Sequence, residues 1–362
     1  MDNRTIGRTF LHVGAPKSGT THLQQIMRVN ARELARRGVH YPVEPAWSRT
    51  VLDPSFRAAL DLTGQGWGGP PGHARGAWDR LARDVRTRPG TSIVSHEILA
   101  GADRAAVARA HHDLAGQEVH VVVTLRDLSR ALPAAWQESI KQGRVWSYRR
   151  FLDRARRGNV WFLRAMDPTR VLETWGSAVP PERVHVVITP RVHDDQNLLW
   201  ERFAAVLGID PAIAVTEVDS NPSLGIHEVQ LLRRLNRELG GRAHRGHLEH
   251  HIIDAVLTPG LRAGADDRTS RVRLPPRCHG WVSDLSSKWI SWLEASGYDI
   301  VGDLDELRPE PTDPANWVDP DKSVDGPTAA MAAEGLAAVI RDAAERKYPL
   351  RTKIRRRLRR TA

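Results

Sequence analysis

Residues 9–27 read TFLHVGAPKSGTTHLQQIM, and this stretch decides the fold class. Its first five residues form a short apolar, β-branched-rich run, which is typical of a buried strand. A loop with glycine at both ends, Gly14 and Gly19, follows the run. From Thr20 onward the apolar residues recur at helical spacing. Together these parts predict an anion cradle, because unpaired backbone N–H groups and the helix dipole both favour negative charge at a helix N-terminus.

The spacing of the loop is close to that of a nucleoside-triphosphate loop, G-x-x-x-x-G-K-[ST]. The two glycines are correctly separated and Thr21 occupies the Ser/Thr position, but Thr20 stands where that motif has its lysine. The lysine of this chain is Lys17, inside the loop, where a compact ammonium group fits better than a planar guanidinium. We therefore expect a loop that holds a nucleotide phosphate but is poorly suited to an NTPase.

The sequence APKSGTT at residues 15–21 resembles the 5′-phosphosulfate loop of sulfotransferases that use 3′-phosphoadenosine 5′-phosphosulfate (PAPS), usually written P-K-[SA]-G-T-[TS]. Further sequence features in the same order as in this family extend the resemblance over about residues 10–210. The chain as a whole is similar to bacterial sulfotransferase-like proteins. It implies that Lys17 neutralises charge on the bridging oxygen as adenosine 3′,5′-bisphosphate leaves, and that no metal is required. The residues that it implies for the 5′-phosphate are Ser18, Gly19, Thr20 and Thr21.

A second candidate position lies at Arg126, directly after the most strand-like run of the chain, residues 118–125. In the sulfotransferases that the loop resembles, an arginine at such a strand end binds the 3′-phosphate, and a serine eight positions later assists it. Arg126 fits the first role, but Ala134 stands at the second position. Ser129 or Arg130, on the first turn of the predicted helix, could substitute for that serine.

Two other interpretations of this strand end stay open. Arg126 and Asp127 could simply cap and pair at the start of a helix. In an NTPase, an aspartate near such a strand end would help to hold Mg²⁺, which the position of the lysine argues against.

We expect the catalytic base at the end of another predicted strand, residues 91–95. His96 and Glu97 follow this strand directly. Sulfuryl transfer to a hydroxyl needs a group that takes the proton, and histidine suits this near neutral pH. Side chains alternate along a strand, so we expect only one of the two to face the site. The position of His96 resembles that of the catalytic histidine in cytosolic sulfotransferases, although Ser95 and Glu97 replace the threonine and leucine of their K-T-H-L-P pattern. Glu97 is the second candidate, and Glu44, which follows a short strand after the loop, is the third.

Short strands alternate with helices along the chain, which predicts an α/β fold with a P-loop-like central parallel sheet flanked by helices. A helical C-terminal extension follows. The predicted divisions are a nucleotide-binding core over residues 1–215, a helical continuation of the same domain over 216–300, an acidic proline-containing linker over 301–326, and an amphipathic helix with a basic tail over 327–362.

Composition narrows the class of protein further. A formal net charge of +10 favours anionic ligands, and the single cysteine, Cys278, excludes an intramolecular disulfide. The chain has neither a signal peptide nor a membrane-spanning run, so a cytoplasmic protein is expected. The basic tail at residues 351–360 is a candidate for contact with an anionic membrane surface, and no nucleic-acid motif accompanies it. His247 and His251 have helical spacing but lack the rest of a zinc motif, so no metal site is predicted.

The expected reaction is therefore transfer of a sulfuryl group from PAPS to a hydroxyl or amine of a carbohydrate, a lipid or a small-molecule acceptor. One alternative is a P-loop-like kinase or NTPase with a variant loop. Another is a non-catalytic sulfotransferase-like binding protein, which the alanine at position 134 keeps open. Neither the acceptor nor the oligomeric state is indicated by the sequence.

Overall fold

The computed structural model describes residues 7–43, 53–67, 69, 72–191, 197–218, 224–240, 271–322, 332 and 336–337. The chain divides into two compact units. The first comprises Met1–Leu132, Arg157–Ser220 and Pro276–Pro311, and the second comprises Pro133–Arg156, Asn221–Pro275 and Thr312–Ala362. Glu44, His247, His251 and the basic tail lie outside the described residues.

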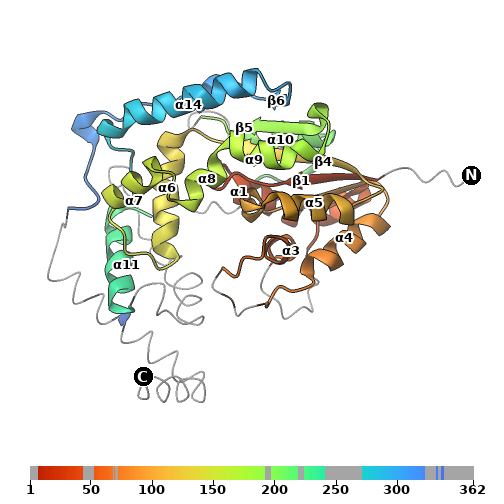
Figure 1. Cartoon of the computed structure of the whole chain (residues 1–362), viewed down its shortest axis with the longest axis horizontal. Coiled ribbons are helices and arrows are strands. Elements are labelled where there is room, and N and C mark those ends of the chain that lie inside the picture. The colour runs from red at the N-terminus through yellow and green to blue at the C-terminus, as the bar shows by residue number, and fades with distance from the viewer. Residues whose placement is uncertain are drawn as a thin grey trace, which may run out of the picture. The chain divides into compact units, whose positions relative to one another are not determined.

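The first unit is built on a six-stranded sheet in which every pair of neighbouring strands is parallel. Its strands are β1 (Arg8–His12), β2 (Val39–His40), β3 (Thr91–Ser95), β4 (Glu118–Leu125), β5 (Val184–Ile188) and β6 (Asp299–Val301) (Figure 1). The order across the sheet is β2-β3-β1-β4-β5-β6. The predicted α/β fold with a central parallel sheet flanked by helices is therefore confirmed.

This strand order fixes where a ligand site should lie. After β1 the chain returns to the sheet at β2, on one side, whereas after β4 it returns at β5, on the other side. The loops that follow β1 and β4 therefore part in opposite directions, and open parallel sheets bind their ligands outside the carboxyl ends of the strands at such a point. The glycine loop and Arg126 follow these two neighbouring strands.

Helices of the first unit flank this sheet (Figure 1). They are α1 (Thr20–Val29), α2 (Ala31–Arg36), α3 (Pro54–Thr63), α4 (Ala77–Thr87), α5 (Arg104–Asp113), α8 (Trp161–Met166), α9 (Pro168–Trp175), α10 (Leu198–Leu207) and α14 (His279–Glu294), with a 3₁₀ turn, η1 (Glu97–Gly101), after β3. Apolar residues of α1, α2 and α10 form one buried cluster with Phe10, Ile93, Val122 and Val187 of the sheet. Within the described residues, no helix is long and apolar enough to cross a membrane.

The second unit contains α7 (Tyr148–Arg156) and α11 (Ile226–Glu238), and α6 (Leu128–Lys141) begins in the first unit and ends in the second. Buried side-chain amides join its segments. Asn236 of α11 donates to the backbone oxygens of Ile140 and Arg144, at 2.7 and 2.9 Å. Asp321 pairs with Arg233 at 3.1 Å and accepts the backbone N–H of Tyr148. Polar side chains thus satisfy backbone groups that the helix ends leave unpaired.

Two segments differ from the sequence analysis. The helical pattern that begins at Thr20 is interrupted at Asn30, between α1 and α2. The Asn30 side-chain amide exchanges two hydrogen bonds with the backbone of Val215, at 2.9 and 3.0 Å. The segment predicted as a linker from residue 301 onward begins in β6 and continues into a 3₁₀ turn, η8 (Leu304–Leu307), where Leu307 is buried. The sequence gives little indication of these two elements, because a three-residue strand and a single buried leucine leave almost no periodic signal.

Candidate active site

The loop between β1 and α1 has a backbone that only certain residues adopt easily. Gly14, Lys17 and Gly19 have φ angles of 124°, 66° and 92°, and this region is unfavourable for residues with a Cβ atom. A Cβ added at Gly19 would also lie 2.4 Å from Cδ2 of Leu199. The two glycines are thus required by shape, whereas Lys17 adopts its left-handed conformation at an energetic cost, which is a feature of functional loops.

The N-terminal end of α1, which follows this loop, has no capping side chain. Gly19 is the N-cap residue of α1, no side chain accepts a hydrogen bond there, and the first turn contains no acidic residue. The N–H groups of the first turn and the positive end of the helix dipole therefore stay available to an anion. The Thr21 side chain is exposed on this turn, whereas that of Thr20 is buried.

A buried chain of hydrogen bonds supports the loop from beneath. His12 Nδ1 lies 2.8 Å from Ser95 Oγ, and His12 Nε2 lies 3.2 Å from Thr124 Oγ1. Thr124 Oγ1 in turn lies 2.5 Å from Ser18 Oγ, and Ser18 Oγ donates to the carbonyl oxygen of Ala15 at 2.5 Å. One set of directions is consistent with these contacts: Ser95 donates to a neutral His12 ring, which donates through Nε2 to Thr124, and Thr124 donates to Ser18. The carbonyl oxygen of Gly14, 3.1 Å from Thr124 Oγ1, then accepts the backbone N–H of Thr124.

The neutral state of His12 agrees with its surroundings. The side chain is completely buried between the sheet and α10, where its ring lies 5.1 Å from that of Phe203. Burial lowers the pKa of His12 to about 4, against a smaller opposing effect of the Glu97 charge. His12 therefore carries no charge near neutral pH and acts as a rigid bridge between β3, β1 and β4. The sequence analysis missed this role, although a histidine inside an apolar strand is a signal that could have indicated it.

Arg126 lies beside the loop, directly after β4, and its side chain is half-buried. Its Nε atom is buried and has no hydrogen-bond partner among the described residues. Burial, followed by the neighbouring charge of Arg130, lowers the pKa of Arg126 to about 10, so the group remains cationic at neutral pH. Buried donors on cationic side chains are usually paired in folded proteins, so this Nε atom is available to an anionic ligand.

The residues that follow Arg126 are already paired. Asp127 is buried, and its carboxylate accepts hydrogen bonds from the Ser129 hydroxyl at 2.5 Å and from the backbone and Nε of Arg130. Both terminal nitrogens of Arg130 donate to the carbonyl oxygen of Pro190 at 3.1 Å. Asp127 therefore fixes the turn after β4. Three protein donors already bind its carboxylate, which makes Asp127 a poor Mg²⁺ ligand.

The structure corrects one expectation about His96 and Glu97. They were expected on opposite sides of a strand, but β3 ends at Ser95 and the chain turns at once into η1. Both side chains consequently lie together, with His96 Nδ1 3.8 Å from Glu97 Oε2. Glu97 Oε2 also lies 3.4 Å from Thr20 Oγ1, so its carboxylate adjoins the glycine loop.

The His96 ring is held by its own turn. Its Nδ1 atom accepts the backbone N–H of Ile98 at 3.2 Å, and the ring stacks on Phe56 with centroids 4.7 Å apart. In the neutral state the proton of the ring is therefore on Nε2. Among the described residues, the structure thus brings Lys17, Thr20, Glu97 and Arg126 to one end of the sheet.

Two polar residues near His96 were not singled out in the sequence. Asp53 caps α3 by accepting the backbone N–H groups of Ser55 and Phe56, and burial raises the pKa of its carboxyl. The Tyr41 hydroxyl is buried without a partner among the described residues, and burial, then the charge of Asp53, raises its pKa. The order Asp-Pro at residues 53–54 is an N-cap signal that could have been read.

Comparisons with known proteins give little beyond this geometry. No protein-family model matches the chain, and no curated protein matches it. Among solved structures, the chain is similar to a sulfotransferase from Alicyclobacillus acidocaldarius, with a TM-score of 0.39 and 14% sequence identity, over 70% of this chain and 96% of that one.

Proposed function

We propose that this protein is a PAPS-dependent sulfotransferase that transfers a sulfuryl group to a hydroxyl or amine of an acceptor. The observation that carries the proposal is the unpartnered, buried Nε of Arg126 beside the glycine loop. A loop that binds only the phosphates of ATP needs a lysine at the start of the helix, where this chain has Thr20. Two cationic side chains on neighbouring strand ends, Lys17 and Arg126, suit instead a nucleotide with separate 5′ and 3′ anionic groups.

The residues of the site fit such a nucleotide. The N–H groups at the start of α1, with the exposed Thr21 hydroxyl, would hold the 5′-phosphate. The hydroxyl of Ser18 is committed to Ala15, so Ser18 would contribute through its backbone N–H. Arg126 would bind the 3′-phosphate through its guanidinium. Ser129 and Arg130 would act through Asp127, which fixes the turn that carries Arg126, because their polar groups are engaged there.

The chain's own groups then account for the chemistry. Bound PAPS supplies an electrophilic sulfuryl group, which forms a bond to the acceptor oxygen as the bond to the bridging oxygen breaks. Lys17 would neutralise the charge that develops on that bridging oxygen, and preorganised positive charge of this kind is worth several kcal/mol, roughly 3–4, to a transition state. The acceptor proton passes to a base at the site.

We favour Glu97 over His96 as that base. The Glu97 carboxylate lies against Thr20 of the loop, whereas the accepting nitrogen of His96 already binds Ile98. The test compares Glu97→Gln with His96→Asn in a radiolabelled transfer assay. A loss of roughly 10²–10⁴-fold in kcat for Glu97→Gln is expected, with a much smaller loss for His96→Asn. The opposite order would make His96 the base.

Calorimetry tests the proposed function itself. The full chain is titrated with adenosine 3′,5′-bisphosphate and, separately, with ADP, which lacks the 3′-phosphate. We expect a clear preference for the bisphosphate that disappears in Arg126→Ala. Equal affinity for both nucleotides, or a Mg²⁺-dependent preference for ADP, would contradict the proposal and favour an NTPase.

A further inference from the structure

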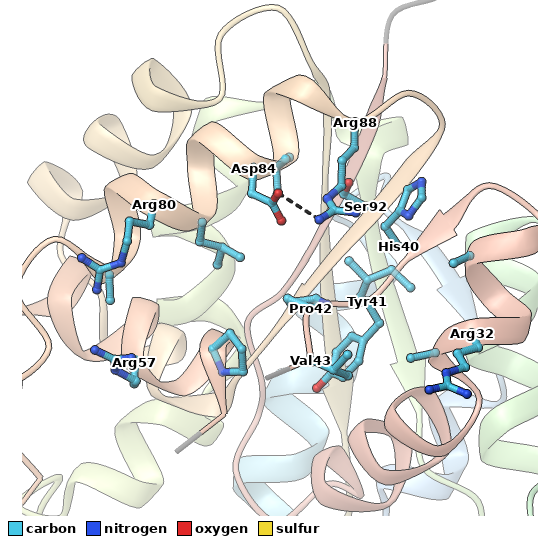
Figure 2. A pocket seen from close by; sticks show the side chains of 17 residues that line it. Arg32, His40, Tyr41, Pro42, Val43, Arg57, Arg80, Asp84, Arg88 and Ser92 are labelled. Atoms are coloured by element: carbon cyan, nitrogen blue, oxygen red, sulfur yellow. Dashed lines mark hydrogen bonds and ion pairs between the residues drawn. The ribbon is translucent and has the colours of Figure 1, made fainter. Parts of the chain in front are cut away.

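The first unit contains a cavity of about 460 Å³ on the β2 side of the sheet (Figure 2). It is bounded by α2, by the chain that leaves β2, by α3 and α4, and by β3. Its volume falls within the range of small-molecule sites. Its lining includes none of the residues that we assign to the nucleotide, so the proposed nucleotide site leaves this cavity unused.

The lining combines an apolar floor with a cationic rim. The apolar residues include Leu81, Val85 and Ile93. The charged residues are Arg32, Arg57, Arg80, Arg88 and Asp84. Figure 2 shows Arg57 and Arg80 on one side of the cavity and Arg32 on the other.

The positive charge of the rim is not balanced by its own residues. Asp84 is the only carboxylate among the described lining residues, and it already pairs with Arg88 at 3.0 Å. Arg32 and Arg80 form no hydrogen bond or ion pair with the part of the chain that the structure describes. Unpaired guanidinium groups around a concave, partly apolar surface attract anions and can bind carboxylate, phosphate or sulfate through two parallel hydrogen bonds.

One residue of the lining lies within range of the charge of the candidate base. Tyr41 lines the cavity, and the charges of Asp53 and Glu97 both act on its phenol. Strand β3 supplies Ser92 and Ile93 to the lining and ends at Ser95, two residues before Glu97. A molecule in the cavity would therefore lie on the same side of the sheet edge as the group that takes the acceptor proton.

We propose that this cavity is the acceptor site and that it selects acceptors carrying an oxyanion on a small hydroxylated ring. The proposal rests on the proposed sulfotransferase function. The apolar floor contacts the ring, and the arginine rim binds the oxyanion. A carboxylate and a sulfate have the same recognition chemistry here, so both kinds of acidic sugar are candidate acceptors.

Three 4-nitrophenyl β-D-glucosides test this selectivity: the neutral glucoside, the glucuronide, and the 6-O-sulfated glucoside. They differ only at carbon 6 of the same ring. Calorimetry with the full chain, without nucleotide, is expected to give at least tenfold tighter binding for the two anionic glycosides, with an affinity that falls as salt is raised. Their relative affinities separate a carboxylate site from a sulfate site. Equal affinity for all three glycosides, or binding of none, would overturn the inference.

Arginine variants locate the binding. Arg32→Ala and Arg80→Ala should each remove most of the preference, a loss of roughly tenfold, and Arg80→Lys should restore part of it. Arg83→Ala is the matched control, because Arg83 is an exposed arginine of the same helix, α4, outside the lining. A preference that survives in both cavity variants would place the anion elsewhere and overturn the assignment.

The failure of this inference is distinguishable from failure of the proposed function. Adenosine 3′,5′-bisphosphate should bind the arginine variants as tightly as the wild type. Unselective glycoside binding with intact bisphosphate binding removes the acceptor site alone. Selective glycoside binding without bisphosphate binding would contradict the proposed sulfotransferase function and leave only an anion-binding cavity.

Discussion

Two polar clusters lie on the same face of the sheet, at opposite ends of its strands. At the amino ends, His120 Nδ1 lies 2.8 Å from His185 Nε2, His120 Nε2 lies 3.0 Å from Glu118, and His185 Nδ1 lies 2.7 Å from Asp299. The second cluster lies at the carboxyl ends and comprises Thr124, Arg126 and the neighbouring glycine loop. Thr124 shares this face of β4 with His120 because side chains alternate along a strand.

The clusters differ in what they leave unpaired. Each ring nitrogen of the two histidines at the amino ends has a protein partner, and the rings stack with centroids 5.1 Å apart. At the carboxyl ends the buried Nε of Arg126 has no partner in the described chain. Buried polar groups are almost always satisfied in stable proteins. We therefore interpret the first cluster as part of the framework and the second as a ligand site.

The substitution Lys17→Ala is the most direct test of this difference between the two clusters. Because the ammonium group would act only on charge that develops during transfer, we expect PAPS-dependent activity to fall by roughly 10³-fold. Thermal unfolding should change little, since alanine meets the same strain at a positive φ. Lys288→Ala, an exposed lysine of α14, is the control and should keep full activity. Transfer that persists in Lys17→Ala would remove this mechanism.

Arg126→Leu separates ligand binding from stability. Adenosine 3′,5′-bisphosphate should bind roughly 10²-fold more weakly, as expected for a lost charge-assisted hydrogen bond in a buried site. The melting temperature without ligand should stay the same or rise, because the substitution removes a half-buried cation whose Nε has no partner in the described chain. A thermal-shift assay with and without the bisphosphate measures both effects. A large loss of stability would mean that Arg126 belongs to the framework.

The sequence predicts the loop, the parallel sheet and Arg126, because each depends on local order: a strand, a glycine-bounded turn and a helix, or a buried strand followed by one cation. The partners of those residues are not predictable in this way. Ser95 and Thr124 meet His12 only because β3 and β4 flank β1, and that order depends on long-range pairing.

The candidate base shows the same limit at short range. Alternation along a strand placed His96 and Glu97 on opposite sides, but it ceases to apply once the strand ends at Ser95. The exact end of a strand is a weak signal in a sequence. The cavity beside β2 was not predicted, because its arginines come from α2, from α3, and from α4 with the residue that follows it, and these segments converge only in the fold.

His185→Ala is expected to show the reverse of Arg126→Leu. The substitution leaves His120 Nδ1 without its partner and opens a small void, which should lower the free energy of unfolding by about 2 kcal/mol. The affinity of the folded variant for adenosine 3′,5′-bisphosphate should not change. Urea unfolding and calorimetry measure the two quantities. A variant that remains stable but loses nucleotide affinity would show that the amino-end cluster also serves the site.

The smallest expected effect is a pH dependence of stability that originates at His12. Its folded-state pKa of about 4 lies below the usual value of 6.5, so between these values the unfolded chain binds a proton that the folded chain does not. Stability must therefore fall as the pH is lowered from 6.5 towards 4, by about 1 kcal/mol between pH 7 and 5.5. Above pH 6.5 this contribution vanishes.

His12→Gln should remove this part of the pH dependence while keeping one donor and one acceptor near Ser95 and Thr124. Melting temperatures of both proteins from pH 5 to 8 test the difference, because titrations elsewhere in the chain are common to both. An unchanged slope would mean that the pKa of His12 is the same in the folded and the unfolded chain, so that His12 would be protonated in the folded protein below about pH 6.5. Nδ1 would then have to donate to Ser95 Oγ, reversing the direction of that bond, and a positive charge would lie beneath the glycine loop. The loop would in that case draw part of its attraction for anions from the framework, and the distinction between the two clusters would weaken.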